Sequence, residues 1–214
     1  MKKTILIFGA GPGIGQAVAQ QFGKQGFAVA LVSRRLENLQ PLVDELQQQQ
    51  ITATAYAADL TDPAAIARVV ADVLLQWQRI DVVHYNAAAV RMVPVLQETA
   101  ATLTEDFKVN VAGLLTVALE AQNALAEVHG ALLVTGGGFA LYPMPEFASL
   151  SVGKAGVRNL ANSLHQALAE KGIFVGTVTV KGYVSPEAEI YHPKNIAEHF
   201  WKLYHSRNAF ELSL

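Results

Sequence analysis

Short runs of apolar, mostly β-branched residues alternate with longer segments of helical periodicity along almost the whole chain. Most of the short runs are continuously apolar rather than alternating, which is typical of strands covered on both faces. The pattern predicts strands at residues 4–8, 28–32, 52–57, 80–85, 131–135 and 174–180. It predicts helices at residues 13–25, 36–49, 63–78, about 101–126, 149–171 and 192–205, with a brief last strand at the sheet edge within 208–214.

The repeated strand–helix–strand order predicts a doubly wound α/β domain. Consecutive parallel strands need right-handed crossovers, which place helices on both faces of the sheet. The sequence Thr61-Asp62-Pro63 is typical of a helix start, because a capping side chain stands just before a proline of the first turn. No linker or internal repeat interrupts the order, so we expect a single domain over residues 1–214.

The composition requires a large, well-covered core and argues against several kinds of partner. Hydrophobic residues make up 51% of the chain and charged residues only 16%, against roughly 25% charged residues in an average globular protein. The formal net charge of -2 supplies no basic field for nucleic acid or for an anionic membrane. There is no cysteine, and the six histidines form no ligand cluster, so we expect no disulfide and no metal site. We find neither a signal peptide nor an unbroken membrane-spanning run of about 20 apolar residues, and we expect a cytoplasmic protein.

A glycine-rich turn with the sequence GAGPGIG joins the first predicted strand to the first predicted helix. Glycine lets the chain turn sharply and lets a pyrophosphate approach main-chain N–H groups. The amino end of the following helix attracts the same anion. The segment therefore predicts a dinucleotide-binding loop with the candidate residues Gly9, Gly11, Pro12, Gly13, Ile14 and Gly15.

The end of the second predicted strand indicates which dinucleotide is bound. A free ribose 2′-hydroxyl usually meets an Asp or Glu at this point, whereas a 2′-phosphate favours arginine. Ser33, Arg34 and Arg35 stand there instead of an acid, and a guanidinium group offers a planar fork that matches phosphate oxygens. The sequence therefore favours NADP(H) over NAD(H) as the cofactor.

The spacing of Gly9, Gly13 and Gly15 departs from the G-x-G-x-x-G pattern. It resembles the TGxxxGxG loop of the short-chain dehydrogenase/reductase family, with Phe8 where threonine is common. Further motifs similar to those of this family follow in order over roughly residues 4 to 185. The resemblance implies a Rossmann-type fold, a nicotinamide cofactor, and hydride transfer between that cofactor and a small carbonyl or alcohol substrate.

The resemblance also implies roles for residues at the ends of the later strands. Asp59 and Leu60 follow the third strand, where the family's aspartate meets the adenine ring. The sequence Asn86-Ala87-Ala88 is similar to the NAG motif that steadies the family's central sheet. Asn110 corresponds to the asparagine of the family's proton relay, and Tyr183 and Val184 correspond to the segment that meets the nicotinamide.

The family's catalytic pattern is incomplete in this chain. The family uses a serine and a Tyr-x-x-x-Lys pair, in which the tyrosine gives or takes the substrate proton and the lysine holds the nicotinamide ribose. Lys154 is in register, but Leu150 stands where the tyrosine is expected, and the run Gly136-Gly137-Gly138 stands where the serine is expected. A positioned general acid contributes typically 10²–10⁴-fold to a rate, so we expect only slight turnover by the family's usual mechanism.

Other groups could supply the missing proton. Tyr142, in the loop before the helix of Lys154, is the first candidate, and Tyr183 is the second. Ser149 and Ser151 flank Leu150, but neighbours on a helix point about 100° apart. The candidate catalytic residues are therefore Asn110, Lys154 and Tyr142.

The leading interpretation is an NADP(H)-binding protein of the oxidoreductase class with an altered site and weak or unconventional activity. One alternative is a reductase whose acid is Tyr142 or a nearby group, and another is a non-catalytic NADP(H) sensor or interaction subunit. Few residues follow Pro186 before the last helix, where the family usually carries a long substrate-covering segment. The resemblance also implies a homodimer, paired through the long helices at 101–126 and 149–171.

Overall fold

The apolar runs of the sequence form the strands of a computed structural model, which describes every residue from Met1 to Leu214. The strands are β1 (Thr4–Phe8), β2 (Ala28–Ser33), β3 (Ala53–Ala57), β4 (Val82–Tyr85), β5 (Ala131–Gly137), β6 (Phe174–Val180) and β7 (Glu211–Ser213). All neighbouring strands are parallel, and they form one sheet in the order β3-β2-β1-β4-β5-β6-β7. The brief strand predicted near the carboxyl end therefore forms at the sheet edge.

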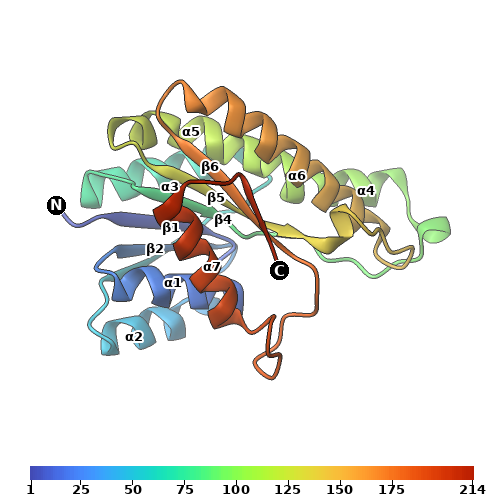
Figure 1. The fold of residues 1–214 in the computed structure, drawn as a ribbon, viewed down its shortest axis with the longest axis horizontal. Helices are drawn as coiled ribbons and strands as arrows, with labels where there is room; N and C mark the ends of the chain where they lie inside the picture. The colour runs from blue at the N-terminus through green and yellow to red at the C-terminus, as the bar shows by residue number, and fades with distance from the viewer.

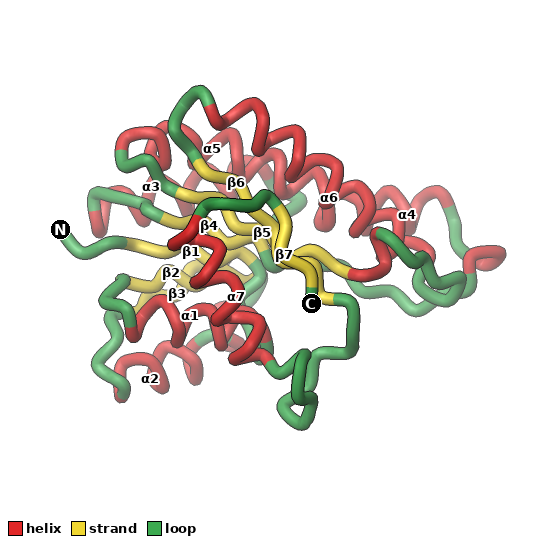
Figure 2. Tube along the Cα trace, viewed as in Figure 1, coloured by secondary structure: helices red, strands yellow, loops and turns green.

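The chain forms seven α-helices, six of which cover the two faces of this sheet. They are α1 (Ile14–Lys24), α2 (Gln40–Gln48), α3 (Pro63–Trp77), α4 (Ala100–Phe107), α5 (Gly113–Glu127), α6 (Ala148–Ala169) and α7 (Pro193–Ser206). The helices α1, α2 and α7 lie on one face, and α3, α5 and α6 lie on the other (Figures 1 and 2). Apolar clusters of 27 and 29 buried residues fill the two interfaces, which explains why most strands are apolar at every position. The single-domain doubly wound α/β fold is confirmed.

Two predicted helices differ from the observed ones. The predicted helix at 36–49 begins with a separate 3-10 turn (Leu36–Asn38), and α2 starts only at Gln40, with a proline in its first turn. The predicted helix at 101–126 is divided by a π-helical turn (Lys108–Ala112) between α4 and α5. The other strands and helices begin and end within about two residues of the predicted bounds, a spread expected at helix and strand ends.

A buried tyrosine accompanies the π-helical turn. The Tyr85 hydroxyl, at the end of β4, donates a hydrogen bond to the carbonyl of Val109 within this turn. Gly113 provides the space, because a β-carbon at that position would be 2.5 Å from the Tyr85 hydroxyl. Such turns are frequent at functional sites, and this one contains Asn110.

The strand order places a crevice at the centre of the sheet. The chain runs outward from β1 to β3 and then returns through α3 to β4 on the other side of β1. The loops that follow β1 and β4 therefore lead away in opposite directions, and the carboxyl ends of the strands form a topological switch point. Ligands of open α/β sheets bind at such a point.

The continuous helical stretch Ala100–Glu127 is long and apolar enough to cross a membrane by length and composition alone. Half of its most apolar window is buried within the fold. Its α5 segment contributes Leu114, Val117, Ala118 and Ala121 to the apolar core of one sheet face. This burial is the pattern of a core helix in a doubly wound domain.

Candidate functional site

The glycine-rich loop packs tightly against the loop that follows β4. Gly9 has a φ of +82°, and a β-carbon on it would be 2.4 Å from the Ala87 amide nitrogen. The amides of Gly9 and Ala10 both donate to the carbonyl of Val32 at the end of β2, at 3.0 and 2.9 Å. Only glycine satisfies both the positive φ and the close approach at position 9.

The outer side of the same loop is open. Gly13 has a φ of +95°, and β-carbons built on Gly11 and Gly13 meet no atom within 4 Å. Gly13 is also the N-cap residue of α1, and no side chain caps that helix end. The first amide groups of α1 are therefore available to an anion, as a dinucleotide-binding loop requires.

A cleft of about 320 Å³ lies at the switch point beside this loop. It is bordered by the carboxyl ends of β1, β2, β3 and β4, and most of its lining side chains are small. The lining residues are Gly9, Ala10, Val32, Ser33, Arg34, Ala58, Asp59, Leu60, Asn86, Ala87, Ala88, Ala89 and Val109. We name this space the adenosine cleft, since the predicted adenosine-contacting residues lie here.

Two charged side chains of opposite sign line the adenosine cleft. Arg34 forms no ion pair within the protein, so its guanidinium is available to a ligand. Asp59 accepts hydrogen bonds from the amide and the hydroxyl of Thr61, at 2.9 and 2.8 Å. These bonds hold the pKa of Asp59 below its usual value, and the positive charge of Arg34 lowers it further.

Ser33 and Arg35 occupy less direct positions. The Ser33 hydroxyl lies in the cleft lining but donates to the Arg35 carbonyl, 2.8 Å away. Arg35 itself does not line the cleft. Of the two arginines predicted to contact a 2′-phosphate, only Arg34 therefore lines the adenosine cleft.

Asn86 connects three strands at the base of the cleft. Its Nδ2 donates to the Gly9 carbonyl at 3.0 Å, and its Oδ1 accepts from the Thr135 hydroxyl at 2.8 Å. The glycine-rich loop after β1 is thereby fixed to β4 and to β5. The resemblance to the NAG motif implies a role of this kind for Asn86.

A buried histidine extends the same chain of hydrogen bonds. The His84 Nε2 lies 2.9 Å from the Thr135 hydroxyl. Because Thr135 donates to Asn86, the His84 Nε2 carries the proton and donates to Thr135. The His84 Nδ1 is buried without a hydrogen-bond partner, and burial lowers the pKa of His84 from 6.5 to about 3. This histidine is therefore neutral near pH 7.

Lys154 lies along the glycine run at the end of β5. Its Nζ donates to the Thr135 carbonyl at 2.9 Å. A β-carbon on Gly137 would be 3.2–3.3 Å from the Cγ, Cδ and Cε of Lys154. The methylene groups of Lys154 therefore lie next to Gly137, where the side chain of a larger residue would begin. Burial lowers the pKa of the Lys154 ammonium group to about 8.

Leu150 and its neighbouring serines are buried at the start of α6. Leu150 is 7% exposed, and it precedes Lys154 by one helical turn. The Ser149 hydroxyl donates to Asp106 at 2.7 Å, and the Ser151 hydroxyl accepts from the Met144 amide at 3.2 Å.

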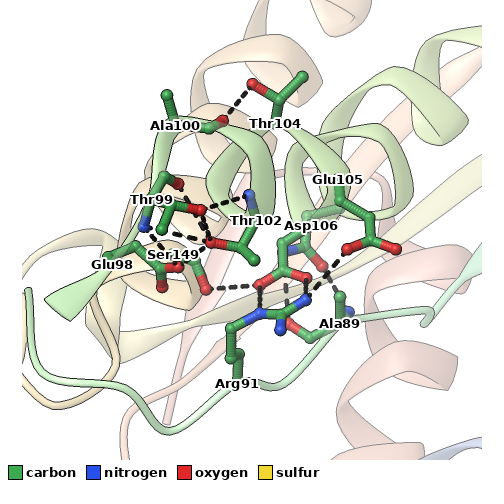
Figure 3. Close-up of polar contacts among 11 residues, drawn as sticks. Ala89, Arg91, Glu98, Thr99, Ala100, Thr102, Thr104, Glu105, Asp106 and Ser149 are labelled. Carbon is green, nitrogen blue, oxygen red and sulfur yellow. Dashed lines mark hydrogen bonds and ion pairs between the residues drawn. The ribbon is translucent and has the colours of Figure 1, made fainter.

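Asp106 joins α6 to the loop after β4, as Figure 3 shows. The Arg91 guanidinium forms two hydrogen bonds of 3.0 Å with the two oxygens of the Asp106 carboxylate. The Ser149 hydroxyl reaches the same carboxylate from α6. These hydrogen bonds lower the pKa of Asp106, with the largest contribution from Arg91. Motif comparison missed this network, because Arg91 and Asp106 belong to no motif and lie far apart in the sequence.

Asn110 is engaged by the main chain. Its Oδ1 accepts from the Ala89 amide at 2.7 Å, and its Nδ2 lies 3.4 Å from the Ala89 carbonyl. A β-carbon on Gly153 would be 2.6 Å from that Nδ2, so α6 packs directly on Asn110. Asn110 therefore holds the loop after β4 against α6, next to Lys154.

The tyrosines proposed as proton donors are on the surface. Tyr142 is 71% exposed and Tyr183 is 87% exposed. No hydrogen bond fixes either hydroxyl. In the segment after β6, Tyr191 instead lies against Gly182, where a β-carbon would be only 2.0 Å from its ring.

The predicted cofactor residues divide between two clefts. Gly9, Ser33, Arg34, Asp59, Leu60, Asn86, Ala87 and Ala88 line the adenosine cleft. Pro12, Gly13 and Val184 line a second, open cleft of about 830 Å³ between α1, α2 and the start of α7. Gly11, Ile14, Gly15, Arg35, Lys154 and Tyr183 line neither cleft. The sequence analysis missed Ala10, Val32, Ala58, Ala89 and Val109; four of these directly adjoin a predicted cofactor residue and Val109 adjoins the predicted Asn110.

The chain is similar in sequence to known proteins. The sequence model of the family described as short chain dehydrogenase matches residues 3–194. One relative is a sorbitol dehydrogenase from Cereibacter sphaeroides, 36% identical over 113 residues. That match covers 53% of this chain and 43% of the relative, so the chain matches less than half of the relative's length.

Solved structures share the fold over nearly the whole chain. An alcohol dehydrogenase from the archaeon Thermococcus sibiricus, complexed with 5-hydroxy-NADP, superposes with a TM-score of 0.89 at 22% identity, covering 99% of this chain and 95% of that one. A metagenomic short-chain oxidoreductase in complex with NADP gives a TM-score of 0.86 at 22% identity, covering 99% and 96%. At these identities the likeness establishes the fold.

Proposed function

The chain belongs to the short-chain dehydrogenase family, and we propose that it is an NADP(H)-binding oxidoreductase with an altered proton-donating site. The main observation in favour of NADP(H) is Arg34, which lines the adenosine cleft and forms no ion pair within the protein. The open main chain at Gly11 and Gly13 fits a diphosphate, and Arg34 fits a 2′-phosphate. Two of the structurally similar proteins were solved with an NADP-type ligand, which supports the same choice. The bound cofactor supplies hydride-transfer chemistry.

The test of this proposal is the cofactor preference of an Arg34→Asp variant. A carboxylate at position 34 repels a 2′-phosphate and accepts a hydrogen bond from a free ribose hydroxyl. We expect the dissociation constant for NADPH to rise at least about 10-fold, as for loss of one charge-assisted contact, while that for NADH changes little. Arg35→Asp is the matched control, because Arg35 does not line the cleft. Equal affinity of the wild type for NADPH and NADH would refute the assignment.

We further propose that carbonyl reduction or alcohol oxidation by the family's usual proton transfer is weak. Leu150 carries no proton, and Gly137 offers no hydroxyl. The retained groups are Asn110, which holds the loop after β4, and Lys154, which corresponds to the lysine that holds the nicotinamide ribose in the family. Tyr142 is the first candidate for a substitute acid, and its exposed position requires the loop to fold inward. Undiminished turnover of Tyr142→Phe would remove Tyr142 from this role.

The alternative function is a non-catalytic NADP(H) sensor or interaction subunit. The burial of Leu150 at the position of the family's acid favours it. Tight NADPH binding without oxidation by any aldehyde, ketone or quinone would support the sensor, and measurable turnover would support the enzyme.

We also propose a cytoplasmic homodimer that acts on a small molecule. Exposed apolar side chains on α5 and α6 support the pairing through long helices: Leu115 and Leu119 on α5, and Val152 on α6, are 41%, 54% and 47% exposed. The segment between β6 and α7 is short, which leaves the substrate side open to water.

A further inference from the structure

Around Lys154, the two positions that carry hydroxyls in the family's pattern, 137 and 150, are occupied by glycine and leucine. Leu150 is buried one turn before Lys154, and the lysine stem covers the bare face of Gly137. The Ser149 hydroxyl is held by the buried carboxylate of Asp106. A ligand bound beside Lys154 would therefore find no side-chain hydroxyl at positions 137 and 150.

We propose that this site reduces quinones rather than aliphatic aldehydes or ketones. The inference rests on the proposed function, because the hydride must come from a reduced nicotinamide cofactor. A hydride acceptor that becomes a stabilised oxyanion needs no acid during the transfer, and a quinone is such an acceptor.

The acidity of the products separates the two classes of acceptor. Reduction of an aliphatic ketone without an acid leaves an alkoxide, which is about as basic as hydroxide from water with a pKa of about 16. Reduction of a quinone leaves a phenolate, and a phenol such as tyrosine has a pKa of about 10. The difference of about six pKa units is about 10⁶-fold in the equilibrium that forms the anion. The loss of the family's acid therefore penalises ketones far more than quinones.

The redox step balances with these components. The hydride, with its electron pair, forms an O–H bond at one quinone oxygen, and the ring electrons shift to leave a phenolate at the other oxygen. The quinone is reduced by two electrons, and the dihydronicotinamide is oxidised by two. Water then protonates the phenolate to give the hydroquinone. We assign stabilisation of the anion before that protonation to the ammonium of Lys154, whose Nζ also donates to the Thr135 carbonyl.

The neighbouring segment offers an apolar wall for a flat ring. The half-buried rings of Phe139 and Phe147 are stacked, with centroids 5.5 Å apart and planes 25° apart. They belong to the loop that directly follows the glycine run, and Phe147 pairs with Val93 of the loop after β4. Aromatic rings of a ligand pack favourably on such a pair.

The first experiment compares two acceptors of similar size on the wild-type protein. NADPH binding is measured beforehand by fluorescence titration, which tests the proposed function independently. Oxidation of NADPH is then followed with tetramethyl-para-quinone, which has no free ring position for lysine to attack, and with cyclohexanedione. Each rate is divided by the rate without protein, to remove the quinone's greater intrinsic reactivity. We expect acceleration of the quinone reaction that exceeds that of cyclohexanedione at least 100-fold. Binding of NADPH without acceleration of the quinone reaction, or equal acceleration of both, would overturn the inference.

A second arm restores the family's donors with the double variant Leu150→Tyr, Gly137→Ser. Because a general acid contributes about 10²–10⁴-fold, the variant should gain at least about 100-fold with cyclohexanedione and little with the quinone. A folded variant that gains equally on both acceptors contradicts the proposed role of the missing acid. If the variant does not fold, the comparison of the two acceptors on the wild-type protein still tests the inference.

A third arm has a readout other than turnover. Para-nitrophenol is titrated into the NADP⁺-saturated protein, and absorbance distinguishes bound phenolate from phenol. We expect the wild type to bind the phenolate. The affinity for the phenolate should be at least 10-fold lower in Lys154→Met, with each protein saturated with cofactor. Equal phenolate binding by both proteins would exclude Lys154 as the partner of the anion.

Discussion

Gly9 and Ala87 are in direct main-chain contact: a β-carbon on Gly9 would lie 2.4 Å from the Ala87 nitrogen. The contact joins the loop after β1 to the loop after β4, on the two sides of the switch point. Asn86 reinforces it through its hydrogen bond to the Gly9 carbonyl. The shape of the adenosine cleft therefore depends on glycine, which has no β-carbon, at position 9.

A Gly9→Ala substitution should damage both stability and cofactor binding. The positive φ and the close approach together predict a loss of about 2–4 kcal/mol in the free energy of unfolding. The measurement is urea denaturation, together with an NADPH titration of the folded fraction. Gly11→Ala is the control, since a β-carbon there meets nothing within 4 Å. Equal stability of the two variants would contradict the packing described for Gly9.

His84 predicts a loss of stability in mild acid. Its pKa is about 3 in the folded protein and 6.5 as its ordinary value, so below pH 6.5 the unfolded chain binds a proton that the folded protein does not. Stability therefore falls as the pH falls from 6.5, by up to about 1.4 kcal/mol per pH unit. His84→Gln should show a shallower decline between pH 6.5 and pH ~5 in denaturation measurements, whereas the exposed His205→Gln should follow the wild type. Parallel curves for wild type and His84→Gln would show that His84 titrates freely.

The Arg91–Asp106 pair predicts a stability effect that a surface pair does not share. The Asp106 side chain is 5% exposed and that of Arg91 is 33% exposed, so Arg91→Met leaves a buried carboxylate with only Ser149 as a partner. We expect a larger loss of stability than at a surface pair, but a smaller one than at a fully buried pair because Arg91 is partly solvated. Arg68→Met is the matched control: its pair with Asp62 is 3.6 Å long, with side chains 67% and 49% exposed, and its loss should stay below about 0.5 kcal/mol.

The depressed pKa of Asp106 adds a pH dependence to that comparison. A lowered carboxyl pKa contributes stability above its ordinary value of 3.8 and loses it as the pH falls through the folded-state pKa. The gap between wild type and Arg91→Met should therefore narrow below about pH 4. A gap that stays constant with pH would mean that charge plays no part in the contact.

The proposed dimer predicts a change of mass on one substitution. Leu119 is 54% exposed on α5, and a glutamate at this position would place a charge within the paired helices. Leu119→Glu should shift the protein from dimer to monomer in light scattering, without loss of NADPH binding. Leu75→Glu is the control, because Leu75 is 83% exposed on α3, which is not one of the two helices proposed to pair. A wild type that is already monomeric would refute the pairing.

The strands were predictable because burial on both sheet faces leaves a strong signal in the sequence. Runs such as Thr4–Phe8 and Phe174–Val180 are buried at every position, so neither strand has a face exposed to solvent. The interruption of the helix at Lys108–Ala112 was not predictable. It accompanies a hydrogen bond from Tyr85, which lies on a distant strand, and local periodicity carries no information about such a contact.

The candidate site was predictable where glycine or charge marks the chain. Gly9 and Arg34 were predicted from their residue types at strand ends, and Asp59 and Asn86 from the resemblance to the family; all four line the adenosine cleft. The position of the Lys154 stem along Gly137, and the Arg91–Asp106–Ser149 network, depend on tertiary packing between segments far apart in the sequence. Sequence spacing alone does not determine such contacts.

The lining of the adenosine cleft has a practical consequence for ligand design. Five of its thirteen lining residues are alanines, Ala10, Ala58, Ala87, Ala88 and Ala89, whose methyl side chains have no rotamer to change. On the proposed binding of NADP(H) in this cleft, we expect dinucleotide analogues with bulky substituents on the purine to bind more weakly than NADP(H). Affinity resins and fluorescent derivatives for this protein should carry their tether at the other end of the molecule.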